Sequence, residues 1–177
     1  NIQDLLAEQT VNKIAADYYH ISQWLEQNAS SDYEFIIIDA PASTSPISIN
    51  AMLAADLIIV PLECEALAIK SLKRFLQAFK ELQKNIEPGL RLAGILLTMY
   101  DDEILSHQQV CRQIYQTLGD SVFETIIPNC PYILEASSMG IDVIQRHLNS
   151  EGATGYIRLA NELLDRFLLP KSEEASQ

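Results

Sequence analysis

Short runs of apolar, mostly β-branched residues recur along the chain, and they constrain its fold more than any other feature. Clear runs occupy 35–38, 56–60 and 93–98, and weaker ones lie at 122–128 and around Val143. A continuous apolar run is typical of a strand buried on both faces, since neither side can be polar. Pro61 follows the second run, and because proline cannot donate to a β ladder, we expect the second strand to end there.

Amphipathic stretches separate these runs. Residues 66–85, 105–118 and 154–169 place apolar side chains at three- and four-residue steps, and a further helix is expected over 11–27. Gly119 and Pro170 are expected to end two of these helices. Strands that alternate with helices predict an α/β fold with a doubly wound, mostly parallel sheet. We expect one domain over 1–170, followed by a disordered polar tail over 171–177.

Composition excludes several protein classes. No apolar run reaches the roughly 18 residues that a membrane span requires. Cys64, Cys111 and Cys130 lack paired metal spacing such as C-x-x-C, which favours reduced thiols in a cytoplasmic protein. A formal net charge of −12 argues against a surface that binds nucleic acid everywhere.

Asp39 directly follows the first apolar run. A carboxylate there would lie at the carboxyl edge of the sheet, where ligands bind in open α/β folds. In P-loop NTPases an aspartate at this place acts on magnesium. Strand-end aspartates also serve in turns and helix caps, so this feature alone leaves both interpretations open.

An ordered series of motifs extends the pattern well beyond Asp39. The series comprises YEFIIIDAP at 33–41, INAMLAAD at 49–56, IVP at 59–61, GILLTMYD at 94–101, IP at 127–128, EA at 135–136, and GA at 152–153 with the final helix. In order and spacing it resembles the ParA/MinD family of deviant Walker ATPases, over about residues 30–170.

The resemblance implies a P-loop NTPase fold of the SIMIBI type, with ATP and Mg²⁺ as cofactors and a homodimer formed around two ATP molecules. Asp39 would be the Walker B residue, acting on Mg²⁺ through water, and the switch segment from Pro41 would include Ser43. The adenine pocket would include Thr98, Met99 and Pro128. Met99 and Pro128 equally suit ordinary core or turn positions.

The phosphate-binding loop of this family is not in the sequence. The six glycines are isolated, and none precedes a Lys-Thr or Lys-Ser pair. Phosphate binding needs several backbone N–H groups at a helix start and a lysine charge. The chain is therefore either the downstream part of a longer protein, missing its N-terminal P-loop strand and helix, or a nucleotide-free relative. We expect the former, because the P-loop strand lies beside the Asp39 strand in this fold and its loss would leave an apolar edge unpaired. The segment alone should then be inactive and poorly folded.

Several positions depart from the family pattern. Ala42 replaces the usual second proline after Asp39, Asn129 and Cys130 replace an Arg-Asn pair, and Ser137 replaces a proline. These changes indicate a divergent branch in which details of the nucleotide pocket differ.

Five of the twelve basic residues cluster on the stretch 66–85. Helical spacing places them on one side, and they are Lys70, Lys73, Arg74, Lys80 and Lys84. They suit either non-specific binding to DNA phosphates, as in ParA relatives, or an ordinary solvated helix surface partly neutralised by Glu81. Glu103 stands where DNA-binding relatives commonly carry arginine, which argues against DNA binding.

The resemblance implies an ATPase that positions or segregates a DNA or cellular cargo. Its ATP dimer would bind nucleoid DNA, and a cargo-bound adaptor protein would stimulate hydrolysis. A MinD-like membrane ATPase is an alternative, but it needs a basic amphipathic C-terminal helix, whereas this chain ends in KSEEASQ. A signalling receiver domain needs an acidic pair early in the chain and a lysine after a late strand, and this sequence has neither in the right place. A nucleotide-free protein-binding relative is a further alternative.

Overall fold

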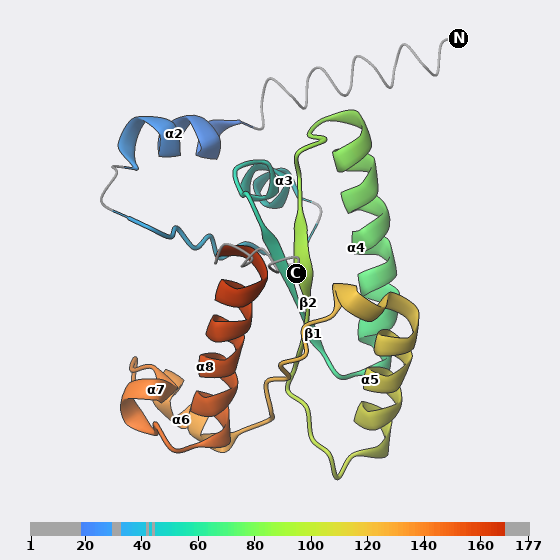
Figure 1. Cartoon of the computed structure of the whole chain (residues 1–177), viewed down its shortest axis with the longest axis vertical. Helices are drawn as coiled ribbons and strands as arrows, with labels where there is room; N and C mark the ends of the chain where they lie inside the picture. The colour runs from blue at the N-terminus through green and yellow to red at the C-terminus, as the bar shows by residue number, and fades with distance from the viewer. Residues whose placement is uncertain (1–18, 30–32, 42, 44, 169–177) are drawn as a thin grey trace, which may run out of the picture. The chain divides into compact units, whose positions relative to one another are not determined.

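The computed structural model describes residues 19–29, 33–41, 43 and 45–168. Helices and strands alternate through most of this part, which confirms the α/β class (Figure 1). The elements are α2 (His20–Asn28), α3 (Pro46–Leu53), β1 (Ile58–Glu63), α4 (Ala66–Asn85), β2 (Leu92–Thr98), α5 (Leu105–Leu118), η1 (Gly119–Ser121), α6 (Pro131–Ser138), α7 (Val143–Arg146), α8 (Glu151–Leu163) and η2 (Leu164–Leu168). They form two compact units, the first drawn from 1–58 and 71–92 and the second from 59–70 and 93–177.

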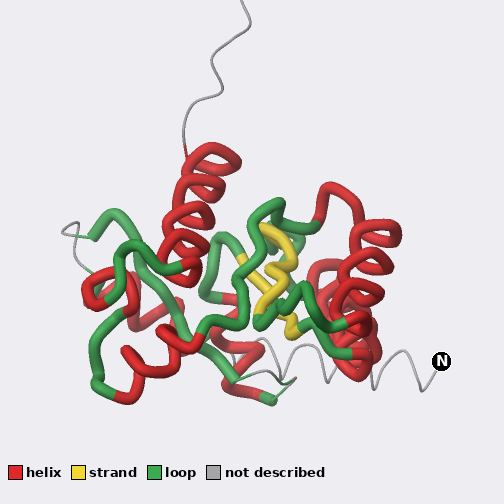
Figure 2. Tube along the Cα trace, turned by 90° about the horizontal axis from the view of Figure 1, so that it is seen from below, coloured by secondary structure: helices red, strands yellow, loops and turns green. Residues whose placement is uncertain are grey.

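The strands β1 and β2 lie side by side and run parallel (Figure 2). The Ile58 N–H donates to Arg91 O at 2.9 Å and the Cys64 N–H donates to Thr98 O at 3.2 Å. Residue numbers rise together on both strands, as parallel pairing requires. Along the other edge of β2, the segment 122–128 adds parallel bridges, so the predicted parallel sheet is confirmed.

Burial differs between the two strands. Residues 93–97 of β2 are all buried, as expected for a strand covered on both faces, whereas β1 alternates between covered and exposed residues. The prediction that Pro61 ends its strand was wrong, because β1 continues to Glu63. The amides of Ile58 and Cys64 point toward β2. Because successive backbone amides of a strand point to opposite edges, the backbone nitrogen of Pro61 points away from β2. Proline loses no ladder bond there.

The first apolar run does not form the buried strand that the sequence predicts. No strand is present over 33–41, and the side chains of Phe35, Ile36 and Ile37 are 56%, 49% and 93% exposed. A strand is held by N–H and C=O partners on a neighbouring strand. Among the described residues no strand pairs with this segment, so its apolar side chains stay uncovered.

The helices follow the sequence more closely. The structure confirms the predicted bounds of α4 and α5. α8 begins three residues earlier than predicted, because Ser150 Oγ accepts the Ala153 N–H at 3.2 Å and caps it there. The expected strand at Val143 is instead the start of α7, capped by Asp142. Of the helix expected over 11–27, residues 20–27 fall within α2; the part before residue 19 and the tail 171–177 lie outside the described residues.

The first unit has an apolar core between α3, α4 and the chain around Leu90. The buried members are Met52, Phe79, Leu82 and Leu90. α2 is held on α3 by polar contacts, since the Ile21 N–H donates to Asn50 Oδ1 at 2.9 Å and Ser22 Oγ donates to Leu53 O at 3.4 Å.

In the second unit, α5 and α8 lie on opposite sides of the strands (Figure 1). Both helices contact the segment 122–128: Tyr115 of α5 donates its hydroxyl to Phe123 O at 2.7 Å, and Arg166 beyond α8 lies over the Phe123 ring. Gly152 and Gly155 let α8 approach closely, since a Cβ at Gly152 would lie 2.6 Å from Ile133 Cγ1. None of the described helices is long and apolar enough to cross a membrane.

Candidate functional site

Asp39 lies in the first unit, at the end of the extended segment 33–41. Its side chain is exposed, as are Ala40 and Pro41. Among the described residues no cluster of three or more histidine, cysteine, aspartate or glutamate side chains could hold a metal ion by itself. A single exposed carboxylate suits Mg²⁺, a hard cation that usually keeps several waters and takes few protein ligands.

Three serine hydroxyls meet shortly after Asp39. Ser43 Oγ lies 2.9 Å from Ser45 Oγ and 2.9 Å from Ser48 Oγ, and the last two hydroxyls are 3.1 Å apart. Ser48 Oγ also donates to Pro41 O at 2.9 Å. Ser45 caps α3, and Pro46 opens it at the first helical position. The predicted switch residues Pro41 and Ser43 are thus joined in one polar network at the start of a helix.

The second unit brings together the three residues predicted to contact adenine. Thr98 is the last residue of β2, Met99 follows it, and Pro128 lies beside them in a parallel bridge with Tyr100. The Tyr100 N–H donates to Ile127 O at 3.2 Å, and the Asn129 N–H donates to Tyr100 O at 2.7 Å. These residues therefore line one edge of the sheet at the carboxyl ends of its strands.

Met99 has an unusual backbone conformation. Its φ is +54°, in the left-handed region that side chains other than glycine seldom adopt. Ile127 donates to Leu97 O and Asn129 donates to Tyr100 O, so β2 advances three residues while its partner advances two. The extra residue bends the chain at Met99 and leaves its side chain 47% exposed.

A larger irregularity lies just before Pro128. The Phe123 N–H donates to Ile95 O and the Ile127 N–H donates to Leu97 O, each at 2.9 Å. In a regular parallel ladder position 125 would donate to Leu97 O, so the segment carries two extra residues. This bulge explains why the expected fourth strand over 122–128 appears as isolated bridges and not as a continuous strand.

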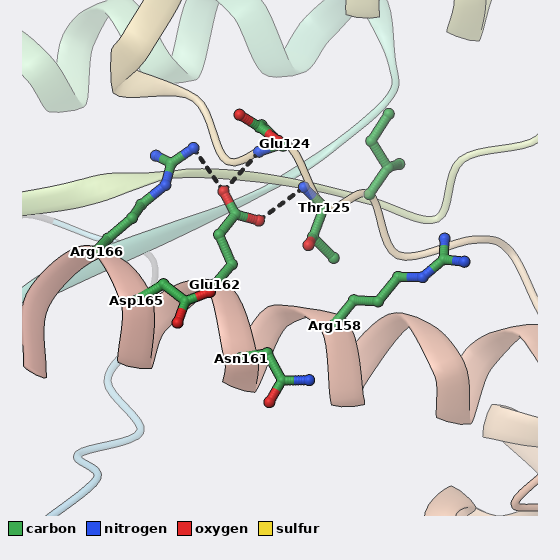
Figure 3. A pocket seen from close by; sticks show the side chains of 8 residues that line it. Glu124, Thr125, Arg158, Asn161, Glu162, Asp165 and Arg166 are labelled. Atoms are coloured by element: carbon green, nitrogen blue, oxygen red, sulfur yellow. Dashed lines mark hydrogen bonds and ion pairs between the residues drawn. The ribbon is translucent and has the colours of Figure 1, made fainter. Parts of the chain in front are cut away.

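The side chain of Glu162, on α8, binds the backbone of this bulge (Figure 3). Its Oε1 accepts the Glu124 N–H at 2.8 Å and its Oε2 accepts the Thr125 N–H at 2.9 Å. Arg166, one helical turn later, places Nη2 2.6 Å from Glu162 Oε1. Burial alone would raise the pKa of Glu162, but hydrogen bonds from Thr125 and Glu124 and the charge of Arg166 outweigh it and lower the pKa below 4.5.

Neither Glu162 nor Arg166 was predicted from the sequence as a site residue. A Glu and an Arg four residues apart on a helix are a recognisable pair. That spacing shows the ion pair but not the backbone amides that the carboxylate also binds. An open groove of about 720 Å³ adjoins the pair. Its lining includes Glu124, Thr125, Arg158, Asn161 and Asp165 (Figure 3).

The five basic residues predicted to share a surface lie along α4, and all are exposed. The ion pairs found in the described part of the chain involve Glu135, Glu162 and their partners, and none involves these five cations.

The chain matches one family model and several known proteins. A family model described as an AAA domain (AAA_31) matches residues 2–92, just over half of the chain. The chromosome-partitioning ATPase Soj of Thermus thermophilus is 40% identical over 134 residues, which cover 76% of this chain and 54% of the relative. The chromosome partitioning protein ParA of Caulobacter vibrioides is 33% identical over 149 residues, covering 84% and 56%.

Among solved structures, cobyrinic acid a,c-diamide synthase of Mycobacterium smegmatis, with a bound ATP analogue and magnesium, matches with a TM-score of 0.72 at 27% identity. The match covers 95% of this chain and 62% of that protein. The chain spans about half the length of the curated relatives it matches.

Proposed function

Because the chain belongs to the ParA/MinD-type ATPase family, we propose that it forms part of an ATP-hydrolysing enzyme that acts in chromosome partitioning. The observation that carries the proposal is the meeting of 98–100 with 127–129 at the carboxyl ends of neighbouring parallel strands. Ligands of open α/β sheets bind at this edge. Two relatives of 33% and 40% identity are named as chromosome-partitioning proteins.

Asp39 is the residue we assign to magnesium. Its exposed carboxylate follows the apolar segment 35–38 and can accept hydrogen bonds from water on the metal. Bound magnesium neutralises charge on the phosphate oxygens of ATP. The neighbouring hydroxyl of Ser43, in the network that includes Pro41 O, is assigned to the segment that responds to the terminal phosphate.

Thr98, Met99 and Pro128 are assigned to the adenine base. Polar groups at an edge of this kind fix the orientation of a ligand, and apolar side chains contact its flat faces. Met99 is half exposed, and its thioether is flexible and polarisable, which suits contact with an aromatic base.

We further propose that the phosphate-binding loop and its strand precede this segment in the full-length protein. The uncovered side chains of Phe35, Ile36 and Ile37 support this, because exposed apolar strands of this length are normally paired or covered. Residues 1–170 would then be the C-terminal part of a single ATPase domain, inactive without the upstream part.

DNA binding by α4 and ATP-dependent dimerisation complete the proposal. The exposed, unpaired cations along α4 support contact with DNA phosphates, and a homodimer would double their number. The cargo would carry an adaptor protein that stimulates hydrolysis, in the cytoplasm and on the nucleoid.

Hydrolysis of Mg·ATP by the purified full-length protein tests the proposal. Asp39→Ala should reduce the hydrolysis rate by at least about a hundredfold, because catalysis of phosphoryl transfer rests on positioned charge. Asp56→Ala, which removes a carboxylate just before β1, serves as the control and should leave the rate within about twofold. A wild-type protein that neither binds nor hydrolyses ATP with magnesium would refute the proposed function.

A further inference from the structure

We propose that Glu162 is a positioning residue for the base pocket: its carboxylate holds the bulge at 124–125 and thereby sets where Ile127 and Pro128 lie against Thr98 and Met99. The inference rests on the proposed function, since it concerns the same nucleotide site. Glu162 would touch no part of the nucleotide and would act through the strand segment alone.

The backbone amides of the bulge are bound by the Glu162 carboxylate. Two extra residues between Phe123 and Ile127 take the Thr125 N–H away from Leu97 O, its partner in a regular ladder, whereas the Glu124 N–H would face away from β2 in such a ladder. Both amides donate to Glu162, at 2.8 and 2.9 Å. A carboxylate that accepts from backbone N–H groups makes stronger hydrogen bonds than a neutral acceptor.

The position of the bulge also determines the position of the base pocket. Without the carboxylate, the half-buried Thr125 N–H loses its partner, and a shift of the segment along β2 would let it donate to Leu97 O, as in a regular ladder. A shift that draws the extra residues into the ladder moves Ile127 and Pro128 relative to Leu97 and Tyr100, their present partners. Residues 127–128 would then no longer lie opposite Thr98 and Met99 in their present positions.

α8 contacts both parts with the same face. A Cβ at Gly155 would lie 3.3 Å from Ile127 Cδ1 and 3.3 Å from Pro128 Cδ, so the helix backbone lies directly against the base segment there. Glu162 follows seven residues later, about two helical turns along. The helix therefore holds the bulge and the pocket edge as one body.

Arg166 orients the carboxylate. Its Nη2 pairs with Glu162 Oε1, its guanidinium lies 5.2 Å from the centre of the Phe123 ring, and both terminal nitrogens lie 3.4 Å from Val122 O. These contacts hold the Glu162 carboxylate in an orientation in which both of its oxygens accept from the bulge. The network explains why a partly covered acid sits beside this strand (Figure 3).

Nucleotide selectivity in the full-length protein tests the inference. Glu162→Ala should weaken ATP binding about tenfold, the effect of losing hydrogen bonds to a charged group. GTP binding should change less, so the ratio of ATP to GTP affinity should fall by a similar factor. Acetate added to this variant should restore part of the ratio, because it can occupy the place of the missing carboxylate. Asp165→Ala removes an exposed acid lining the same groove and should leave the ratio unchanged.

Amide hydrogen exchange supplies a readout independent of nucleotide. The amides of Glu124 and Thr125 should exchange faster in the variant, while that of Phe123 stays protected by its bond to Ile95 O. If Glu162→Ala does not fold, Glu162→Gln carries the test, since it keeps the volume and one acceptor oxygen, and it should show a smaller loss of selectivity.

The outcomes separate the two proposals. A wild-type protein that does not bind ATP overturns the proposed function and this inference together. If the wild type binds ATP and the folded Glu162 variants keep its affinity and its selectivity, only the role of Glu162 is refuted. Faster exchange at 124–125 with unchanged selectivity also refutes it, because the residue would then be merely structural.

Discussion

Replacing Gly152 with alanine should destabilise the protein, although the change usually favours a helix. A methyl group at this position would lie 2.6 Å from Ile133 Cγ1, 2.8 Å from Ile133 Cδ1 and 3.3 Å from Cys130 Cβ. Ile133 cannot retreat freely, because it packs against the buried side chains of Ala136, Val143 and Ala153. Overpacking of this kind costs about 1–3 kcal/mol.

The helical preference of alanine over glycine returns about 1 kcal/mol, so Gly152→Ala should lower the unfolding free energy by up to about 2 kcal/mol. Urea unfolding of the full-length protein measures this change. A double-mutant cycle isolates the clash: Ile133→Ala removes both of the closest atoms, and in that background Gly152→Ala should stabilise by up to about 1 kcal/mol. If Gly152→Ala stabilises equally in both backgrounds, the methyl group meets no resistance and the reasoning is wrong.

Three further predictions concern surfaces and charge. Ile37→Lys should raise the soluble yield of residues 1–177 expressed alone, yet lower the unfolding free energy of the full-length protein by about 2 kcal/mol or more, because we propose that this side chain is covered there. If Ile37→Lys leaves the unfolding free energy of the full-length protein unchanged, this side chain is not covered there. Because the pKa of Glu162 is lowered in the folded state, the ionised carboxylate stabilises the fold above about pH 4.5. This contribution to the unfolding free energy is lost as the pH falls through the lowered pKa. The difference in urea midpoint between wild type and Glu162→Gln should therefore shrink below about pH 4.5, and a constant difference would speak against it. A fourfold exchange of α4 lysines for glutamate should weaken retention of DNA at low salt by about a hundredfold or more, whereas Arg112→Glu on α5 should have little effect, and equal retention would exclude this surface. The four exchanged residues are Lys70, Lys73, Lys80 and Lys84.

Local patterns predicted the two longest helices well, whereas α3, α6 and α7 were not predicted. α4 and α5 have the expected bounds because the three- and four-residue spacing of apolar side chains is a property of the segment itself. β2 was predicted for a related reason, since a strand buried on both faces requires an unbroken apolar run.

Features that depend on a neighbouring strand could not be read in this way. The run at 35–38 has the composition of a buried strand, but its state is decided by a partner that the described residues do not provide. The segment 122–128 also reads as a continuous strand, because the two extra residues of its bulge appear only when the hydrogen bonds to β2 are followed.

The candidate site divides along the same line. The motif order identified Thr98, Met99 and Pro128, and the structure brings 98–100 beside 127–129, although their role with adenine stays a prediction. The left-handed backbone at Met99 and the hydrogen bonds between Glu162 and the bulge depend on long-range packing. Neither can be predicted from the residue type at positions 99 and 162.

The serine network after Asp39 is short of protons. The hydroxyls of Ser43, Ser45 and Ser48 make three contacts with one another and a fourth with Pro41 O, but each hydroxyl supplies a single proton. Three protons cannot serve four contacts, so one pair of oxygens always faces without a hydrogen between them. A water or amide that brings its own proton relieves this shortage. A phosphate oxygen does the opposite, because it brings no proton, and a hydroxyl that donates to it must give up a bond inside the network.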